Sequence, residues 1–158
     1  MFDLGRYVPY LVNRTGTAIA TAFSRELLPF QLNLQMWRVL AALWHADSQR
    51  LGDLAQNTDI EVSTLSRLIG SMQSQGHVSR VRSGADARAV TVTLTKQGRS
   101  LTERLIPIAL RYEAAALQGF THQEAELLRD LLERVRGNMG SIPATATQGV
   151  LETTLENG

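Results

Sequence analysis

Apolar residues recur at steps of three and four along most of the chain, which is the spacing of amphipathic helices. Pro9 suits the first turn of the first helix, and Pro29 blocks its continuation. Pro107 falls inside a later helical stretch and predicts a kink or break near residues 103–107. The helices that this pattern predicts cover residues 9–28, 33–46, 50–57, 62–75, about 96–118 and 121–137.

Between the fourth and fifth of these helices the apolar spacing changes from helical to alternating. Apolar residues alternate with threonines over residues 90–95, which is typical of a half-buried strand. Residues 77–82 form a second predicted strand, and residues 83–88 between the two are rich in turn-forming types. This segment therefore predicts a β-hairpin.

Polar residues and glycine at the helix ends agree with these boundaries. Asn33 and Thr95 stand where a helix N-cap is needed. Thr121 and Glu124 have the spacing of a capping box at the start of the last helix. Gly76 fits the end of the fourth helix, where a left-handed backbone conformation is common.

The composition excludes several classes of protein. The chain has 158 residues, 44% of them hydrophobic, which suffices for one compact domain. Without cysteine there are no disulfides, thiolate metal sites or cysteine nucleophiles, and the three histidines lack a metal-ligand spacing. The sequence also has no nucleophile elbow and no glycine-rich phosphate loop. We therefore expect no metal, no cofactor and no enzyme activity.

The chain also lacks signals for a membrane or for export. Arginines interrupt every apolar run before it reaches the roughly 20 residues that a membrane span needs. The N-terminus has no basic segment followed by an apolar stretch and a cleavage site. We expect a cytoplasmic protein with no membrane partner.

Positive charge is concentrated in the middle of the chain. Residues 61–100 contain six basic and two acidic residues, a net charge of +4, although the whole chain carries only +1. A basic block on a nearly neutral protein is typical of a surface that binds nucleic acid. A window of this length can also reach +4 by chance.

The outward face of the predicted helix 62–75 has an unusual composition. It carries one arginine and otherwise small residues, with no lysine or glutamate: Ser63, Arg67, Gly70, Ser71 and Ser74. Small hydroxyl side chains let a helix backbone approach a flat or grooved surface closely, as entry into the DNA major groove requires.

Four short motifs, in order, resemble the MarR family of winged-helix transcription factors. They are Ser63-Thr64-Leu65-Ser66-Arg67-Leu68-Ile69, Gly76-His77-Val78-Ser79-Arg80, Asp86-Ala87-Arg88-Ala89-Val90 and Leu94-Thr95-Lys96-Gln97-Gly98-Arg99. The resemblance implies a mainly α fold with a small β-hairpin, a winged helix-turn-helix flanked by dimerisation helices. Residues 1–140 would form one unit, with the winged helix at about 33–95, dimerisation helices at about 5–28 and 96–138, and a flexible tail at 141–158.

The resemblance also assigns roles on DNA. Residues of helix 62–75 would meet the major groove, while Asp86 steadies the wing and Arg88 enters the minor groove. An alternative for Asp86 and Arg88 is an ion pair that only caps the turn. The candidate DNA-binding residues are Ser63, Thr64, Ser66, Arg67, Ser71, Arg82, Asp86 and Arg88.

A second candidate site comes from the aromatic residues, which gather in the first part of the chain. Trp37 and Trp44 lie seven residues apart on one predicted helix face with the small Ala41 between them. This spacing predicts a slot between two indoles, and nearby arginines suit a planar carboxylate. The alternative is that these rings form core or dimer interface. The candidate ligand-binding residues are Tyr10, Arg14, Phe23, Trp37, Arg38, Ala41 and Trp44.

Together these observations predict a homodimeric repressor that binds a pseudo-palindromic operator in double-stranded DNA. A small effector, an aromatic carboxylate or its thioester, would release it. The alternatives are a winged-helix dimer that serves as a protein-interaction module and a DNA-binding protein that responds to no ligand. The positive charge of residues 61–100 favours DNA over a protein partner.

Overall fold

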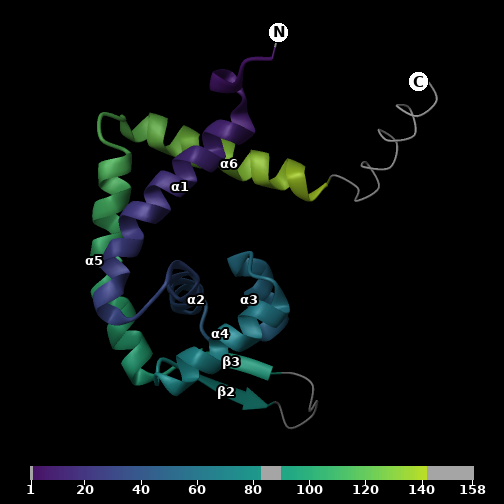
Figure 1. Cartoon of the computed structure of the whole chain (residues 1–158), viewed down its shortest axis with the longest axis vertical. Helices are drawn as coiled ribbons and strands as arrows, with labels where there is room; N and C mark the ends of the chain where they lie inside the picture. Colours follow the sequence, from purple (N-terminus) through teal and green to yellow (C-terminus); the bar gives the residue numbers. More distant parts are fainter. Residues whose placement is uncertain (1, 83–89, 142–158) are drawn as a thin grey trace, which may run out of the picture. The chain divides into compact units, whose positions relative to one another are not determined.

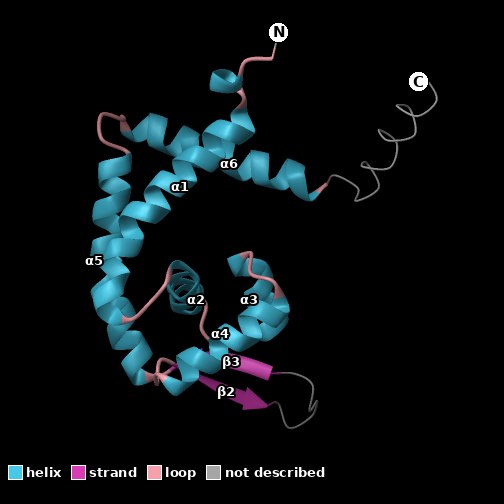
Figure 2. Ribbon diagram, in the orientation of Figure 1, coloured by secondary structure: helices cyan, strands magenta, loops and turns pink. Residues whose placement is uncertain are grey.

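The computed structural model describes residues 2–82 and 90–141 (Figure 1). The chain divides into two compact units, residues 1–116 and 117–158. Helices make up most of the described residues, and the first unit also holds a three-stranded antiparallel sheet (Figure 2). The fold is therefore mainly α with a small β element, as the sequence predicts.

The first unit opens with the 3₁₀ turn Leu4–Arg6, α1 (Val8–Leu27), the 3₁₀ turn Leu28–Phe30 and α2 (Leu34–His45). It continues with β1 (Gln49–Arg50), α3 (Leu51–Thr58), α4 (Val62–Ser74), β2 (Val78–Arg82), β3 (Val90–Leu94) and α5 (Lys96–Ala116). The second unit holds α6 (His122–Gly140). All six predicted helices and both predicted strands are present, and their ends differ by a few residues.

Of the kink or break expected near residues 103–107, the break does not occur: α5 continues through Pro107 as one helix. A proline removes one backbone hydrogen bond and crowds the carbonyl four residues earlier, which bends a helix without always ending it. Leu101, Thr102 and Leu105 are buried along α5, so packing on the core holds this part of the helix in place. In Figure 2, α5 bows along its length.

The sheet contains the predicted hairpin and one strand that the sequence pattern missed. The strand order is β1-β3-β2, and both pairs are antiparallel. Val92 in the central strand β3 lies opposite Arg80 of β2 and Gln49 of β1. β1 is only two residues long, too short to show an alternating pattern, and it exists because β3 offers it a free edge.

The core of the first unit is built around α2. Val39, Leu40 and Leu43 of α2 are fully buried, together with Leu65 and Ile69 of α4. Within each helix these residues are one, three or four positions apart and form a single apolar stripe. The predicted inward faces of both helices are therefore confirmed, and the opposite face of α4 is left outside.

Three aromatic rings connect α1, α2 and α5. The Phe23 ring packs edge-to-face against Trp37 at 5.5 Å and against Tyr112 at 5.6 Å between ring centroids. The Tyr112 hydroxyl donates a hydrogen bond of 3.0 Å to Glu26 of α1. Such pairs each contribute about 0.5–1.5 kcal/mol beyond their buried area, so α1 is joined to both α2 and α5.

The predicted caps are confirmed. Asn33 accepts a hydrogen bond of 2.9 Å from the Met36 amide at the start of α2. Thr95 accepts one of 2.9 Å from the Gly98 amide at the start of α5. The capping box between Thr121 and Glu124 opens α6. These local interactions determine where the helices begin, and they hold the elements that carry the candidate sites.

Candidate functional site

α4 presents a narrow face of small side chains and one arginine to solvent. Ser63, Arg67 and Ser71 are exposed on it, and Ser66 and Gly70 are half-buried. Arg67 makes no hydrogen bond or ion pair with any other residue in the described ranges. The predicted outward set is therefore brought together on one face, with a free guanidinium among small side chains.

Glu61 caps the start of this helix. Its carboxylate accepts hydrogen bonds of 3.0 Å from the Ser63 amide and 3.0 Å from the Thr64 amide. It also accepts a hydrogen bond from the Ser63 hydroxyl. The hydroxyl and these amides lower the pKa of Glu61 to about 2, so the carboxylate is ionised at neutral pH.

Arg80 of β2 holds the middle of α4 to the sheet. One guanidinium nitrogen of this half-buried side chain donates a hydrogen bond to the Ser66 backbone carbonyl. The Arg80 Nε atom is buried and has no partner in the described ranges. A backbone carbonyl has two lone pairs, so the Ser66 carbonyl can accept this bond in addition to its bond within the helix. The bond couples the position of α4 to β2.

Of the three predicted wing residues, Arg82 belongs to the part of the chain that the structure describes. Arg82 ends β2, at the point where the chain enters the hairpin loop. Asp86 and Arg88 lie outside the described residues. The strands on either side of them pair in a defined register, from Val78 opposite Leu94 to Arg82 opposite Val90.

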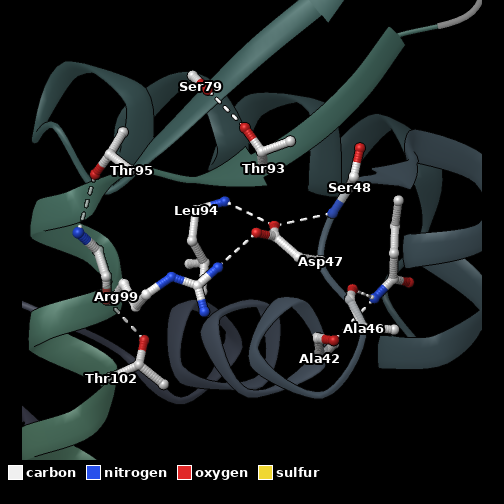
Figure 3. A network of polar contacts seen from close by, with 12 residues as sticks. Ala42, Ala46, Asp47, Ser48, Ser79, Thr93, Leu94, Thr95, Arg99 and Thr102 are labelled. Atoms are coloured by element: carbon white, nitrogen blue, oxygen red, sulfur yellow. Dashed lines mark hydrogen bonds and ion pairs between the residues drawn. The ribbon is translucent and has the colours of Figure 1, made fainter.

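A polar network centred on Asp47 joins α2, the sheet and α5 (Figure 3). Asp47 Oδ1 accepts hydrogen bonds from the Leu94 amide at 3.1 Å and the Ser48 amide at 2.9 Å. Asp47 Oδ2 forms an ion pair with Arg99 of α5 at 2.6 Å. The carboxylate takes the place of a strand carbonyl at the edge of β3, beyond the end of the short β1.

Trp37, Arg38 and Ala41 line a cavity of about 410 Å³ between α2 and the end of α3. Asp59 lines the other side, in a left-handed conformation that ends α3. Arg38 is exposed and has no hydrogen bond or ion pair among the described residues. The cavity therefore offers an aromatic wall, a small residue and an unpaired cation. Its lining residues are Trp37, Arg38, Ala41, Ala42, Asn57, Thr58 and Asp59.

Trp44 lies apart from the cavity that Trp37 and Ala41 line. Trp44 is absent from the lining of this cavity, and the Arg99 guanidinium lies 5.6 Å from the centroid of its ring. Seven residues of helix separate Trp44 from Trp37 by about 10 Å along the axis, so each indole meets a different neighbour.

The other predicted ligand residues also lie elsewhere. Phe23 is enclosed in the core, with 5% of its surface exposed. Arg14 lies over the Tyr10 ring at 5.8 Å and lines a different cavity of about 450 Å³ on α1. Of the two candidate cations for the ligand, Arg38 lines the same cavity as Trp37 and Ala41, and Arg14 lines the one on α1.

Sequence reasoning missed the roles of four residues that shape these sites. Glu61 was not predicted as an N-cap because glutamate is not a preferred N-cap residue, although it directly precedes the predicted helix. Asp47 and Arg99 are 52 positions apart, and no local pattern connects them. Arg80 belonged to a recognised motif, yet its bond to Ser66 depends on the packing of β2 against α4.

The described residues contain no cluster of three or more histidine and acidic side chains that could hold a metal ion. In the same ranges, no helix is long and apolar enough to cross a membrane.

Known proteins are similar to this chain in sequence and in fold. A family model described as transcriptional regulator SarA/Rot matches residues 22–105. The transcriptional activatory protein BadR from Rhodopseudomonas palustris is 31% identical over 150 residues, which cover 92% of this chain and 82% of BadR.

Two solved structures are also similar. A MarR family transcriptional regulator from Silicibacter pomeroyi has a TM-score of 0.78 and 31% identity, with 86% of this chain and 92% of that chain covered. BpsR from Bordetella bronchiseptica, whose DNA binding is regulated by 6-hydroxynicotinic acid, has a TM-score of 0.75 and 26% identity, with 82% and 98% covered. The chain belongs to the MarR family of winged-helix transcriptional regulators, and it is a DNA-binding regulator of this type.

Proposed function

We propose that the protein is a homodimeric repressor that binds a pseudo-palindromic operator and leaves it when a planar aromatic carboxylate, or its thioester, binds. The exposed face of α4 carries the DNA-binding part of this proposal. Its small side chains allow the helix backbone close to the base edges, and the free Arg67 can form a bidentate contact with guanine. Arg82, Asp86 and Arg88 belong to the wing, which reaches the neighbouring minor groove.

Arg67→Ala tests this assignment. A lost bidentate base contact costs about 1–3 kcal/mol and relaxes the sequence preference at one position in each half-site. Arg134→Ala, an exposed arginine on α6, is the matched control. The measurement is fluorescence anisotropy with duplexes selected from a random pool. Unchanged affinity and base preference in Arg67→Ala would show that α4 does not read the groove.

Exposed apolar residues on both terminal helices support the dimer. In α1, Val8, Leu11, Val12 and Ile19 are each between 43% and 54% exposed. A second group on α6 consists of Leu127, Leu131, Leu132, Val135 and Met139. Burying these stripes against a second copy of the chain would give a two-fold interface, and a two-fold protein matches a pseudo-palindromic site with half-sites about 10 bp apart.

Leu131→Glu tests the dimer, with Gln123→Glu on the same helix as a control for the added charge. Leu131→Glu should lower the dimer content and the operator affinity together, because a buried unpaired carboxylate disfavours the interface. Sedimentation at micromolar concentration measures the first, and anisotropy the second. A monomer that binds both half-sites with full affinity would contradict the proposal.

The cavity beside Trp37 carries the effector part. A carboxylate needs a paired cation when it is partly buried, and Arg38 is unpaired there. An aromatic ring can lie against the Trp37 indole over the small Ala41. BpsR responds to 6-hydroxynicotinic acid, a planar aromatic acid, and this similarity favours the same class of ligand here.

The aromatic chain supplies a route from this cavity to the helices. Trp37 contacts Phe23, and Phe23 contacts Tyr112 of α5. A ligand that moves the indole therefore acts on α1 and α5 as well as on α2. To release the operator it must prefer the other conformation, and a hundredfold preference supplies about 2.7 kcal/mol.

Two variants test the cavity. Ala41→Trp should fill it and abolish effector binding while operator binding persists. Arg38→Gln should weaken the binding of carboxylates but not of the corresponding amides. Trp44→Phe leaves Trp37 as the single reporter, so its fluorescence is titrated with benzoate, 6-hydroxynicotinate and benzoyl thioester. If none of these quenches Trp37 or releases DNA, the cavity is not the effector site.

A further inference from the structure

The first turn of α4 differs from a helix start that binds phosphate. In a phosphate-binding helix the free N-terminal amides point at the anion. Here the Glu61 carboxylate already accepts from the amides of Ser63 and Thr64. Its negative charge is exposed at this end of the helix and repels a second anion.

Glu61 also determines how Ser63 can bind. A serine hydroxyl has one proton and two lone pairs. The Ser63 proton is donated to Glu61 Oε2, which can only accept because the carboxylate is ionised. Ser63 therefore presents only lone pairs to an approaching molecule, and Glu61 Oε1 keeps a further lone pair beyond the one used by the Ser63 amide. This end of α4 is a group of acceptors.

The four bases respond differently to such a group. In the major groove, guanine shows the acceptors N7 and O6, thymine shows the acceptor O4, and adenine shows the acceptor N7 beside its amino group. Cytosine alone shows a donor, the N4 amino group, without an acceptor next to it. Acceptors that include a carboxylate therefore favour cytosine and disfavour the other three bases.

Two observations independent of Glu61 support DNA binding at this face. The chain belongs to a family of DNA-binding regulators. Arg67, one turn further along the same exposed face as Ser63, is a free donor with no partner in the described residues. The face therefore has an acceptor end at Glu61 and Ser63 and a donor at Arg67, which complement cytosine and guanine respectively.

We propose that Glu61, together with the Ser63 hydroxyl that it orients, is a specificity-determining residue that selects a cytosine at one position in each operator half-site. The proposal rests on the proposed function, in which α4 enters the major groove. Glu61 acts both by accepting from the cytosine N4 amino group and by repelling bases and phosphates that offer only acceptors.

The experiment selects bound duplexes from a random-sequence pool with the full-length protein and sequences them. Glu61→Ser keeps a preferred capping oxygen but removes the carboxylate, whereas Glu61→Gln keeps the length and adds a donor. Glu103→Gln, an exposed glutamate on α5, controls for the loss of one negative charge. Melting temperatures of all four proteins show whether the cap is retained.

The wild type and Glu103→Gln should both enrich one cytosine per half-site. Glu61→Ser should lose about tenfold of that preference, in line with one base contact, and bind random duplexes more tightly because a repulsive charge is gone. Glu61→Gln should shift the same position toward adenine, since an amide pairs with the adenine N6 and N7 atoms.

Three results would overturn the proposal. If Glu61→Ser selects the wild-type motif, or loses affinity for all duplexes by the same factor, Glu61 only caps the helix. If Arg67→Ala alters the motif while both Glu61 variants keep it, α4 reads the groove and only the role of Glu61 is wrong. If the wild type enriches no motif at all, the proposed function fails and this inference fails with it.

Discussion

Substitutions of Asp47 can separate two of the interactions that its carboxylate makes (Figure 3). The first is the ion pair with Arg99, in which the Asp47 side chain is 37% exposed and the Arg99 side chain 46%. The second is the hydrogen bond to the Leu94 amide at the end of β3, where the residue is only 8% exposed. The two interactions differ in strength because water screens only the first.

The expected magnitudes follow from this difference. An exposed ion pair contributes about 0.2–1 kcal/mol. A buried amide left without an acceptor costs about 1–3 kcal/mol. Asp47→Ala loses both interactions and should destabilise the protein by about 1–4 kcal/mol. Asp47→Asn keeps an acceptor for Leu94 and loses only the charge, so it should cost no more than Arg99→Gln, which also loses the contact with the Trp44 ring.

Urea unfolding followed by circular dichroism measures the free energies of unfolding of Asp47→Ala, Asp47→Asn and Arg99→Gln relative to the wild type. All proteins are compared at the same concentration, because a dimer is stabilised by mass action. Raising the salt concentration should reduce the difference in unfolding free energy between the wild type and Asp47→Asn. The part of the Asp47→Ala cost that comes from the unsatisfied Leu94 amide should remain. If Asp47→Asn is as damaging as Asp47→Ala, the ion pair dominates and the reasoning from burial is refuted.

Two further predictions concern the junction of α4, β2 and α5. Gly98→Ala should destabilise the protein by about 1–3 kcal/mol, because an added Cβ would lie 1.9 Å from the His77 carbonyl oxygen. Gly52→Ala in α3, where nothing lies within 4 Å of the new carbon, should be neutral or stabilising in the same thermal unfolding experiment. Burial lowers the pKa of His77 below its ordinary value of 6.5, so the neutral ring is favoured in the folded state. Stability should therefore hold above about pH 6.5 and fall as the pH drops below it, and His77→Leu should flatten this dependence between pH 5 and 7. A wild-type stability that rises on acidification through this range would contradict the second prediction.

The local sequence determined most of the secondary structure. Helical spacing, the caps at Asn33, Thr95 and Thr121, and the alternation in residues 90–95 each act over a few residues. These signals placed six helices and a hairpin in their observed order. The exposed face of α4 followed in the same way, because a helix with one apolar stripe has a defined opposite side.

The tertiary structure decided everything that depends on residues far apart in the chain. β1 has no pattern of its own and forms only because β3 provides a partner edge. Trp37 and Trp44 share a helix face, yet one lines a cavity with α3 and the other lies beneath Arg99 of α5. Helical phase limits which way a side chain points, but the neighbouring element determines what it meets, and that choice is made by packing over the whole core.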